Sequence, residues 1–109
     1  MKYKIEITKE AERDFENIFT YISETLCNKQ AALRMISLLD KNIRSLTDMP
    51  NSYPKVKDMY LKKMGLRFIT VKNYIVFYTV EDEERKVYIV RILYGKRNWV
   101  KILQDDFEV

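Results

Sequence analysis

Histidine is absent from this sequence of 109 residues, and Cys27 is its only cysteine. The missing histidine removes the usual general base near neutral pH, the commonest metal ligand and every Ser-His or Cys-His nucleophile system. A single cysteine excludes an intrachain disulfide and a thiolate metal cluster. We therefore expect no metal and no cofactor. An enzyme built from this chain would have to act with lysine, arginine, tyrosine, aspartate or glutamate.

Glycine and proline are also scarce, with two of each, which leaves no room for a long linker or a low-complexity segment. No apolar run reaches the roughly 18 residues of a membrane span, and the N-terminal MKYKIEIT lacks the apolar block of a signal peptide. We predict a single domain over residues 1–109 that is cytoplasmic and makes no membrane contact.

The excess positive charge lies in the second half of the chain. Residues 1–50 carry eight Lys/Arg and eight Asp/Glu, whereas residues 51–109 carry twelve and eight. The whole net charge of +4 therefore belongs to the second half. This asymmetry favours a phosphate, a polyanion or an acidic protein as partner of that half, although a solvated basic face would give the same pattern.

Apolar spacing predicts a strand and two helices in the first half. Residues 2–8 alternate between polar and apolar, as in a half-buried strand. Residues 9–26 and 28–46 carry apolar side chains three and four positions apart, which indicates two amphipathic helices. Thr8 and Asn28 are suited to cap their N-termini. Because so few residues separate the helices, we expect an antiparallel hairpin.

The second half reads as a loop followed by a β-meander. Residues 47–63 hold both prolines and no sustained period, so we expect a loop with at most a short helical turn. Three β-rich runs follow at residues 66–71, 74–80 and 86–93. Their tight connections require antiparallel pairing. The tail, residues 98–109, is compatible with either a short helix or an ordered extension.

The fold class is therefore α+β: an N-terminal strand, then an antiparallel two-helix hairpin packed on a C-terminal three-stranded antiparallel meander. We expect the first strand to join the edge of the sheet. The hairpin covers one face of the sheet, and the other face is predicted to be open or to need a partner.

Alternation also assigns the strand cations to faces of the sheet. Arg67 shares a face with Ile69 and Val71. In the last strand one face is predicted to hold Val87, Ile89, Arg91 and Leu93.

A cation within such a strand needs a carboxylate, a phosphate or the margin of the sheet. We expect Arg67 and Arg91 to lie near each other on the exposed face, with Lys96 and Arg97 just past the strand end. In the alternative, Arg91 pairs with a helix carboxylate, such as Glu16 or Asp40.

The tyrosines of the meander admit two interpretations. Tyr74 and Tyr78 share one face of their strand, and the next strand carries Tyr88 and Tyr94. Aromatic rings beside basic residues can stack nucleobases. Tyrosine in a meander more often packs with its hydroxyl at the margin.

The order of these elements resembles toxins of the RelE/ParE superfamily from bacterial type II toxin–antitoxin systems, over nearly the whole chain. The stretch ITKEAERDFENIFTYI is similar to the family's threonine and first helix, and AALRMISLLDKNIRSLTDMP to its second helix, which closes on a proline. The stretch LRFITVKNYIVFYTVEDEERKVYIVRILYGKRN resembles its arginine-led strand, its Tyr-x-x-x-Tyr strand and its closing strand with Gly-Lys-Arg.

This resemblance implies a target-binding surface and a partner. The surface comprises the concave face of the sheet and the end of the last strand. The partner is a cognate antitoxin whose C-terminal segment wraps the toxin and neutralises it; operator DNA is contacted only through that antitoxin. The matching surface positions in this chain are Arg67, Tyr78, Arg91, Tyr94, Lys96 and Arg97.

Two branches of the superfamily imply different targets. RelE-like members are metal-independent, ribosome-dependent endoribonucleases that cut messenger RNA; here they would use Arg67, Arg91, Lys96 and Arg97. Ile75, however, stands where that branch has an arginine, and Leu103 stands near the place of its C-terminal tyrosine.

ParE-like members, the plasmid-stabilisation branch, are not enzymes and arrest growth by inhibiting DNA gyrase. The long hairpin and the ending Tyr94-Gly95-Lys96-Arg97-Asn98 resemble this branch more closely. We therefore expect a ParE-like toxin. A RelE-like messenger-RNA endoribonuclease remains an alternative, as does a degenerate, non-toxic member that acts only in the antitoxin complex.

Overall fold

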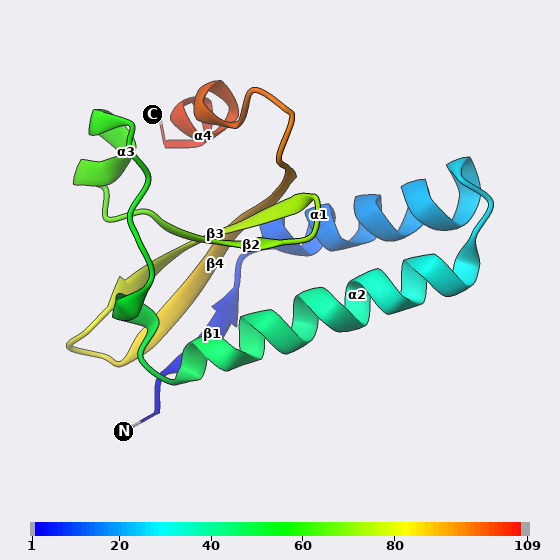
Figure 1. Ribbon diagram of the computed structural model, residues 1–109. Helices are drawn as coiled ribbons and strands as arrows, with labels where there is room; N and C mark the ends of the chain where they lie inside the picture. Colours follow the sequence, from blue (N-terminus) through cyan, green and yellow to red (C-terminus); the bar gives the residue numbers. More distant parts are fainter. Residues whose placement is uncertain (1, 108–109) are drawn as a thin grey trace.

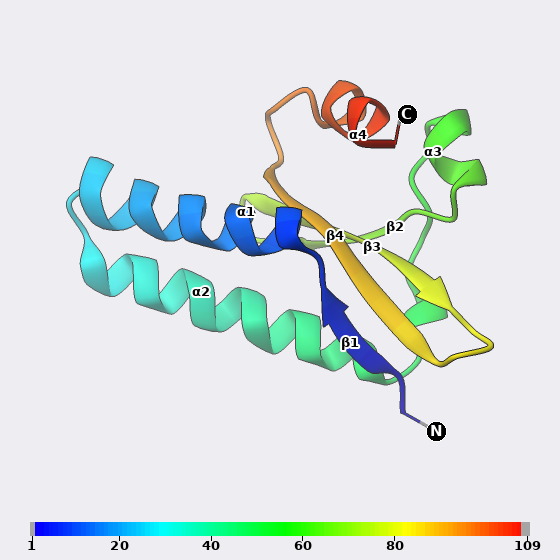
Figure 2. The same cartoon turned by 180° about the vertical axis from the view of Figure 1, so that it is seen from behind.

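The computed structural model describes residues 2–107, which form a four-stranded sheet between two helical layers (Figures 1 and 2). A long helix hairpin covers one face, and two shorter helices lie over the other. In chain order the elements are β1 (Lys4–Ile7), α1 (Lys9–Thr20), the π-helix η1 (Tyr21–Thr25), α2 (Lys29–Arg44), the 3-10 turns η2 (Ser45–Thr47) and η3 (Pro50–Ser52), α3 (Met59–Lys63), β2 (Arg67–Val71), β3 (Tyr74–Glu81), β4 (Lys86–Tyr94) and α4 (Trp99–Phe107).

Both predicted helix caps are present at the starts of α1 and α2. The Thr8 hydroxyl accepts a hydrogen bond from the Ala11 backbone N–H at 3.2 Å, and the Asn28 side-chain oxygen accepts one from Ala31 at 3.0 Å. These contacts satisfy N–H groups that have no partner within a helix. The antiparallel hairpin is confirmed.

No helix within residues 2–107 combines the length and apolar character needed to cross a membrane.

The sheet has the strand order β1-β4-β3-β2. The two hairpin connections make β2, β3 and β4 an antiparallel meander, as predicted. Strand β1 pairs with β4 in parallel and forms the edge, which confirms the expected place of the first strand. The fold class expected from the sequence is therefore correct.

One β-bulge in β4 changes which side chains share a face. Tyr78 lies opposite Ile89 while Phe77 lies opposite Arg91, so Val90 is an extra residue in the ladder. An extra residue shifts the alternation by one position. The prediction that Val87, Ile89, Arg91 and Leu93 share a face is therefore wrong: the first two face the helix hairpin, and the last two face the opposite side.

The face predicted to be open is covered by α3 and α4. A second core lies there, in which Leu61, Phe77, Leu93 and Leu103 are at most 1% exposed. The tail supplies this cover because its apolar residues recur at helical spacing and form the buried side of α4. The sequence left the state of this tail open; Glu108 and Val109 lie outside the described residues.

Candidate functional site

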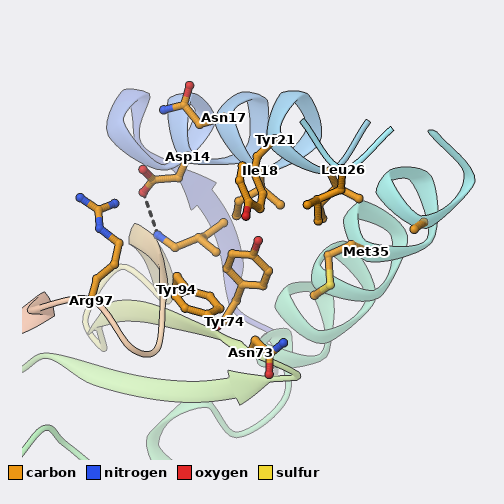
Figure 3. Close-up of a pocket in the computed structure, with 13 residues that line it drawn as sticks. Asp14, Asn17, Ile18, Tyr21, Leu26, Met35, Asn73, Tyr74, Tyr94 and Arg97 are labelled. Atoms are coloured by element: carbon orange, nitrogen blue, oxygen red, sulfur yellow. Dashed lines mark hydrogen bonds between the residues drawn. The ribbon is translucent and has the colours of Figure 1, made fainter. Parts of the chain in front are cut away.

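A groove of about 660 Å³ runs between the helix hairpin and the end of the sheet formed by β3 and β4 (Figure 3). It forms because the hairpin reaches beyond the sheet, so part of the inner apolar surface of α1, η1 and α2 has no strand beneath it (Figure 1). Tyr21 and Leu26 are accordingly 50% and 55% exposed. The lining residues are Asp14, Asn17, Ile18, Tyr21, Ile22, Leu26, Ala31, Met35, Asn73, Tyr74, Ile92, Tyr94 and Arg97.

Three tyrosines, Tyr21, Tyr74 and Tyr94, contribute rings and hydroxyl groups to this groove. The Tyr74 and Tyr94 rings meet edge to face, with centroids 5.9 Å apart, and Figure 3 shows Tyr21 and Tyr74 pointing toward each other from opposite walls. Burial, followed by the neighbouring Tyr21 and Tyr94, raises the pKa of Tyr74 above its ordinary value of 10.0. A tyrosine hydroxyl is protonated near neutral pH in any case, so the Tyr74 hydroxyl can donate a hydrogen bond, and the raised pKa extends this to more alkaline pH.

Two exposed cations, Lys96 and Arg97, lie on the turn that follows β4 at one end of the groove. Arg97 lines the groove itself, and Lys96 lines an adjoining hollow of about 200 Å³. The turn is closed by the Arg97 N–H, which donates to the Tyr94 carbonyl at 3.0 Å, and the Gly95 N–H ties it to the β2–β3 connection by donating to the Asn73 carbonyl at 2.8 Å. A Cβ at position 95 would lie 3.3 Å from that carbonyl oxygen, so the close approach favours glycine.

Arg91 does not join these two cations. Its guanidinium donates to both carboxylate oxygens of Asp14, at 2.7 and 3.0 Å, and to Asp106 at 2.8 Å. The hydrogen bonds to Asp14 are the main cause that raises the pKa of Arg91 above its ordinary value. The alternative prediction, that Arg91 pairs with a helix carboxylate, is thus correct. The partners are Asp14 and Asp106, and not the named candidates Glu16 and Asp40.

Arg67 and Tyr78 form a separate pair at the other end of the sheet. They lie opposite each other on β2 and β3, and the Arg67 guanidinium donates to the Tyr53 carbonyl. Because Arg67 pairs with Tyr78 and Arg91 with the adjacent Phe77, the two arginines point to opposite faces. The prediction that they lie near each other is therefore wrong.

Tyr78 also differs from the expected surface residue. Its side chain is 0% exposed, and its hydroxyl donates to the Pro50 carbonyl at 2.7 Å. Burial raises the pKa of Tyr78 well above its ordinary value. Of the six predicted surface residues, Tyr94, Lys96 and Arg97 are the three that the fold brings together on an exposed surface.

Sequence reasoning missed the helix side of the groove, namely Asp14, Asn17 and Tyr21. For Asp14 a signal was present: it lies three residues after Ala11 and four before Ile18, inside the apolar stripe of α1. A carboxylate in such a stripe needs a buried partner, and Arg91 supplies it. Tyr21 gave no comparable signal, because its place above Tyr74 depends on the tertiary packing.

The described part of the chain, residues 2–107, contains no group of three or more His, Cys, Asp or Glu side chains placed to hold a metal ion. The groove offers aliphatic side chains, tyrosine rings with their hydroxyls, the amides of Asn17 and Asn73, and the Arg97 guanidinium, while its one carboxylate, Asp14, is paired with Arg91. Such a surface can bind an apolar segment together with an anionic group.

Comparison with known proteins identifies the family. The profile of the family described as "ParE toxin of type II toxin-antitoxin system, parDE" matches residues 5–99. No curated protein matches the chain.

Several solved structures share its fold. One chain from the structure of the chromosomal ParDE toxin–antitoxin system of P. aeruginosa superposes on this chain with a TM-score of 0.73 at 16% identity. The superposition covers 87% of this chain and 98% of the other. A mutant of the E. coli toxin RelE in the free state gives 0.68 at 14% identity and covers 100% of both chains. The RelBE2 toxin–antitoxin complex of Mycobacterium tuberculosis gives 0.65 at 17%, with 86% and 99% covered.

The family profile spans β1 to the start of α4, so it includes the hairpin, the meander and the turn with Lys96 and Arg97. The likeness to the solved toxins agrees with the same arrangement of strands and helices. The resemblance inferred from the sequence is confirmed: this chain belongs to the ParE toxin family within the RelE/ParE superfamily and is the toxin of a type II toxin–antitoxin system.

Proposed function

We propose that this toxin arrests growth by inhibiting DNA gyrase in the cytoplasm, and that a cognate antitoxin neutralises it. The observation that carries the proposal is the separation of the cations. Lys96 and Arg97 are exposed beside Tyr94, while Arg91 is held by two carboxylates and Arg67 points to the opposite face from Arg91. Such an arrangement favours binding to an acidic or phosphate-bearing surface over cleavage of a phosphodiester.

Cleavage of RNA without a metal makes stricter demands. Several cations must converge on one phosphate to stabilise its transition state, and a nearby group must transfer the proton. The four cations that a RelE-like site would use do not converge here, because Arg67 and Arg91 point to opposite faces. Tyr78 is also unsuited to proton transfer, since its buried hydroxyl already donates to Pro50.

The groove supports the proposed neutralisation by an antitoxin. Its exposed apolar residues, such as Leu26, would be covered by an apolar segment, and Arg97 at its end would pair with a carboxylate of that segment. A bound segment would also mask Tyr94 beside the two exposed cations. Binding of the antitoxin and binding of the target would then be mutually exclusive.

Expression of the chain from a tightly controlled promoter tests the proposal. Growth, DNA synthesis and bulk protein synthesis are followed separately over about an hour, a window that separates a primary block from later effects. We expect DNA synthesis to stop first, with filamentation and intact transcripts. An early stop in translation with cleaved messenger RNA would contradict the proposal and support the endoribonuclease alternative. Unimpaired growth would support a degenerate member of the family.

A further inference from the structure

We propose that the surface of the loop around α3 is a second docking site, which takes an acidic polypeptide segment with apolar anchor residues. We define the α3 loop as residues 54–66. In Figure 1 the helix of this loop lies at the end of the molecule away from the tip of the helix hairpin, and thus away from the groove. The proposal does not depend on gyrase being the target.

The first observation is an unbalanced positive charge. The loop contains four lysines, Lys55, Lys57, Lys62 and Lys63, and all four are exposed. Within residues 2–107 none of them forms an ion pair. Like charges this close together repel, so an anionic partner would relieve an unfavourable interaction.

The only carboxylate of the loop, that of Asp58, accepts hydrogen bonds and does not pair with a lysine. Asp58 caps α3, where one oxygen accepts from the Leu61 N–H at 3.0 Å, and the other oxygen accepts from the Gln104 amide at 3.2 Å. It is partly buried by these contacts. The positive charge of the four lysines therefore faces solvent.

The second observation is exposed apolar surface among these lysines. Met59 is 76% exposed, Tyr60 43% and Met64 45%. In the five-residue α3 only Leu61 is buried, so the fold uses one anchor and leaves the other large side chains outside. Methionine side chains adapt to varied apolar partners and are frequent at binding surfaces.

The loop presents this surface from a fixed backbone. The Val56 N–H donates to the Leu66 carbonyl at 3.0 Å, and the Phe68 N–H donates to Pro54 at 3.2 Å, which closes the loop at its base. Val56, Leu61 and Leu66 are at most 1% exposed and belong to the core beneath α4. Little ordering of the loop would accompany binding, which favours affinity.

The combination selects a polypeptide over a nucleic acid. Lysines alone would suit phosphates, but single-stranded nucleic acids are held chiefly by stacking on aromatic faces. Here the most exposed apolar side chains are those of Met59 and Met64, which have no aromatic face. The one aromatic residue of α3, Tyr60, is held toward α4 because its hydroxyl donates to the Phe107 carbonyl. An acidic segment with leucine or phenylalanine anchors matches both the charge and the apolar surface.

Fluorescence anisotropy with labelled peptides tests this proposal on the full chain. The probe is a peptide of about twelve residues in which glutamates alternate with leucine pairs, and its control replaces every leucine by serine. We expect the leucine peptide to bind at least about tenfold more tightly than the serine peptide. The variant Lys62→Glu/Lys63→Glu should weaken binding of the leucine peptide about tenfold. The variant Met59→Ser/Met64→Ser should abolish the preference for leucine.

The matched control is Lys9→Glu/Lys29→Glu, which makes the same change in net charge on exposed residues at the helix N-termini of α1 and α2. This control should change the affinity for the leucine peptide by less than about twofold. Equal weakening by both charge-reversed variants would overturn the proposal, because only net charge would then matter. Tighter binding of single-stranded DNA than of the leucine peptide would overturn it too, and so would binding unaffected by the loop variants. Circular dichroism of each variant verifies the fold.

Discussion

Asp14 on α1 and Arg91 on β4 form a two-point ion pair across the end of β1. The carboxylate accepts from the arginine at 2.7 and 3.0 Å, and the same carboxylate accepts from the Ile92 backbone N–H at 2.8 Å. Strand β1 ends at Ile7, so beyond Ile89 the edge of β4 has no strand partner. Asp14 takes the place of that strand and ties the first helix to the sheet.

This relationship predicts that Asp14→Ala lowers the free energy of unfolding by about 3 kcal/mol, because it leaves a mostly buried guanidinium and a backbone N–H without their main acceptor. Urea unfolding followed by circular dichroism measures the change. Asp106→Ala is the matched control, since it removes a more exposed partner of the same arginine and should lower the free energy by less than about 1 kcal/mol. Equal losses in the two variants would show that Asp14 has no special role.

The buried hydroxyl of Tyr78 predicts two effects of Tyr78→Phe. Near neutral pH the variant should lose about 1 kcal/mol of the free energy of unfolding, because the Pro50 carbonyl loses its donor. Burial raises the pKa of Tyr78 in the folded state above the ordinary value of 10.0. The stability linked to this phenol is therefore complete below pH 10 and is lost as the pH rises further.

The free energy of unfolding, measured from pH 8 to pH 11, should consequently fall less steeply with pH for Tyr78→Phe than for the unchanged chain. Some dependence will remain, because burial and its tyrosine neighbours also raise the pKa of Tyr74. Identical slopes for the two proteins would mean that Tyr78 ionises as easily in the folded as in the unfolded chain.

Gly65 ends α3 in the left-handed region, with φ of +79°. Its N–H donates to the Lys62 carbonyl and the next N–H to Leu61, which is the hydrogen-bond pattern of a Schellman motif. A Cβ at this position meets no atom within 4 Å, so Gly65→Ala tests the backbone alone. We expect a loss of about 1 kcal/mol in thermal or urea unfolding, with Gly65→Asn less affected. A neutral alanine variant would contradict this assignment.

The proposed target predicts that the purified toxin inhibits supercoiling by DNA gyrase. The variant Lys96→Ala/Arg97→Ala should raise the inhibitory concentration about tenfold, because it removes both exposed cations at the end of the groove. Lys9→Ala/Lys29→Ala, which removes two exposed cations from the helix hairpin, serves as the control and should change inhibition little. An unchanged inhibitory concentration for Lys96→Ala/Arg97→Ala would show that this turn does not contact gyrase.

Local signals in the sequence determined the first strand, the two long helices, the three strands of the meander and the family. Thr8 and Asn28 start the helices, short polar turns join the last three strands, and the order of these pieces matches the ParE toxins. Each of these features depends on residues close in the chain, so spacing and capping suffice to predict it.

Only the tertiary structure decided which residues meet. The bulge at Val90 reverses the face of Arg91, and the alternation rule had no local cue for one extra residue. The tail folds into α4 and covers the second face because the meander offers it an apolar surface, which a window on the tail does not contain. The groove likewise depends on how far the hairpin extends past the sheet, and so Tyr21 meets Tyr74 although 53 positions separate them in the chain. Contacts of this kind follow from packing between distant segments, and the sequence specifies them only through the complete fold.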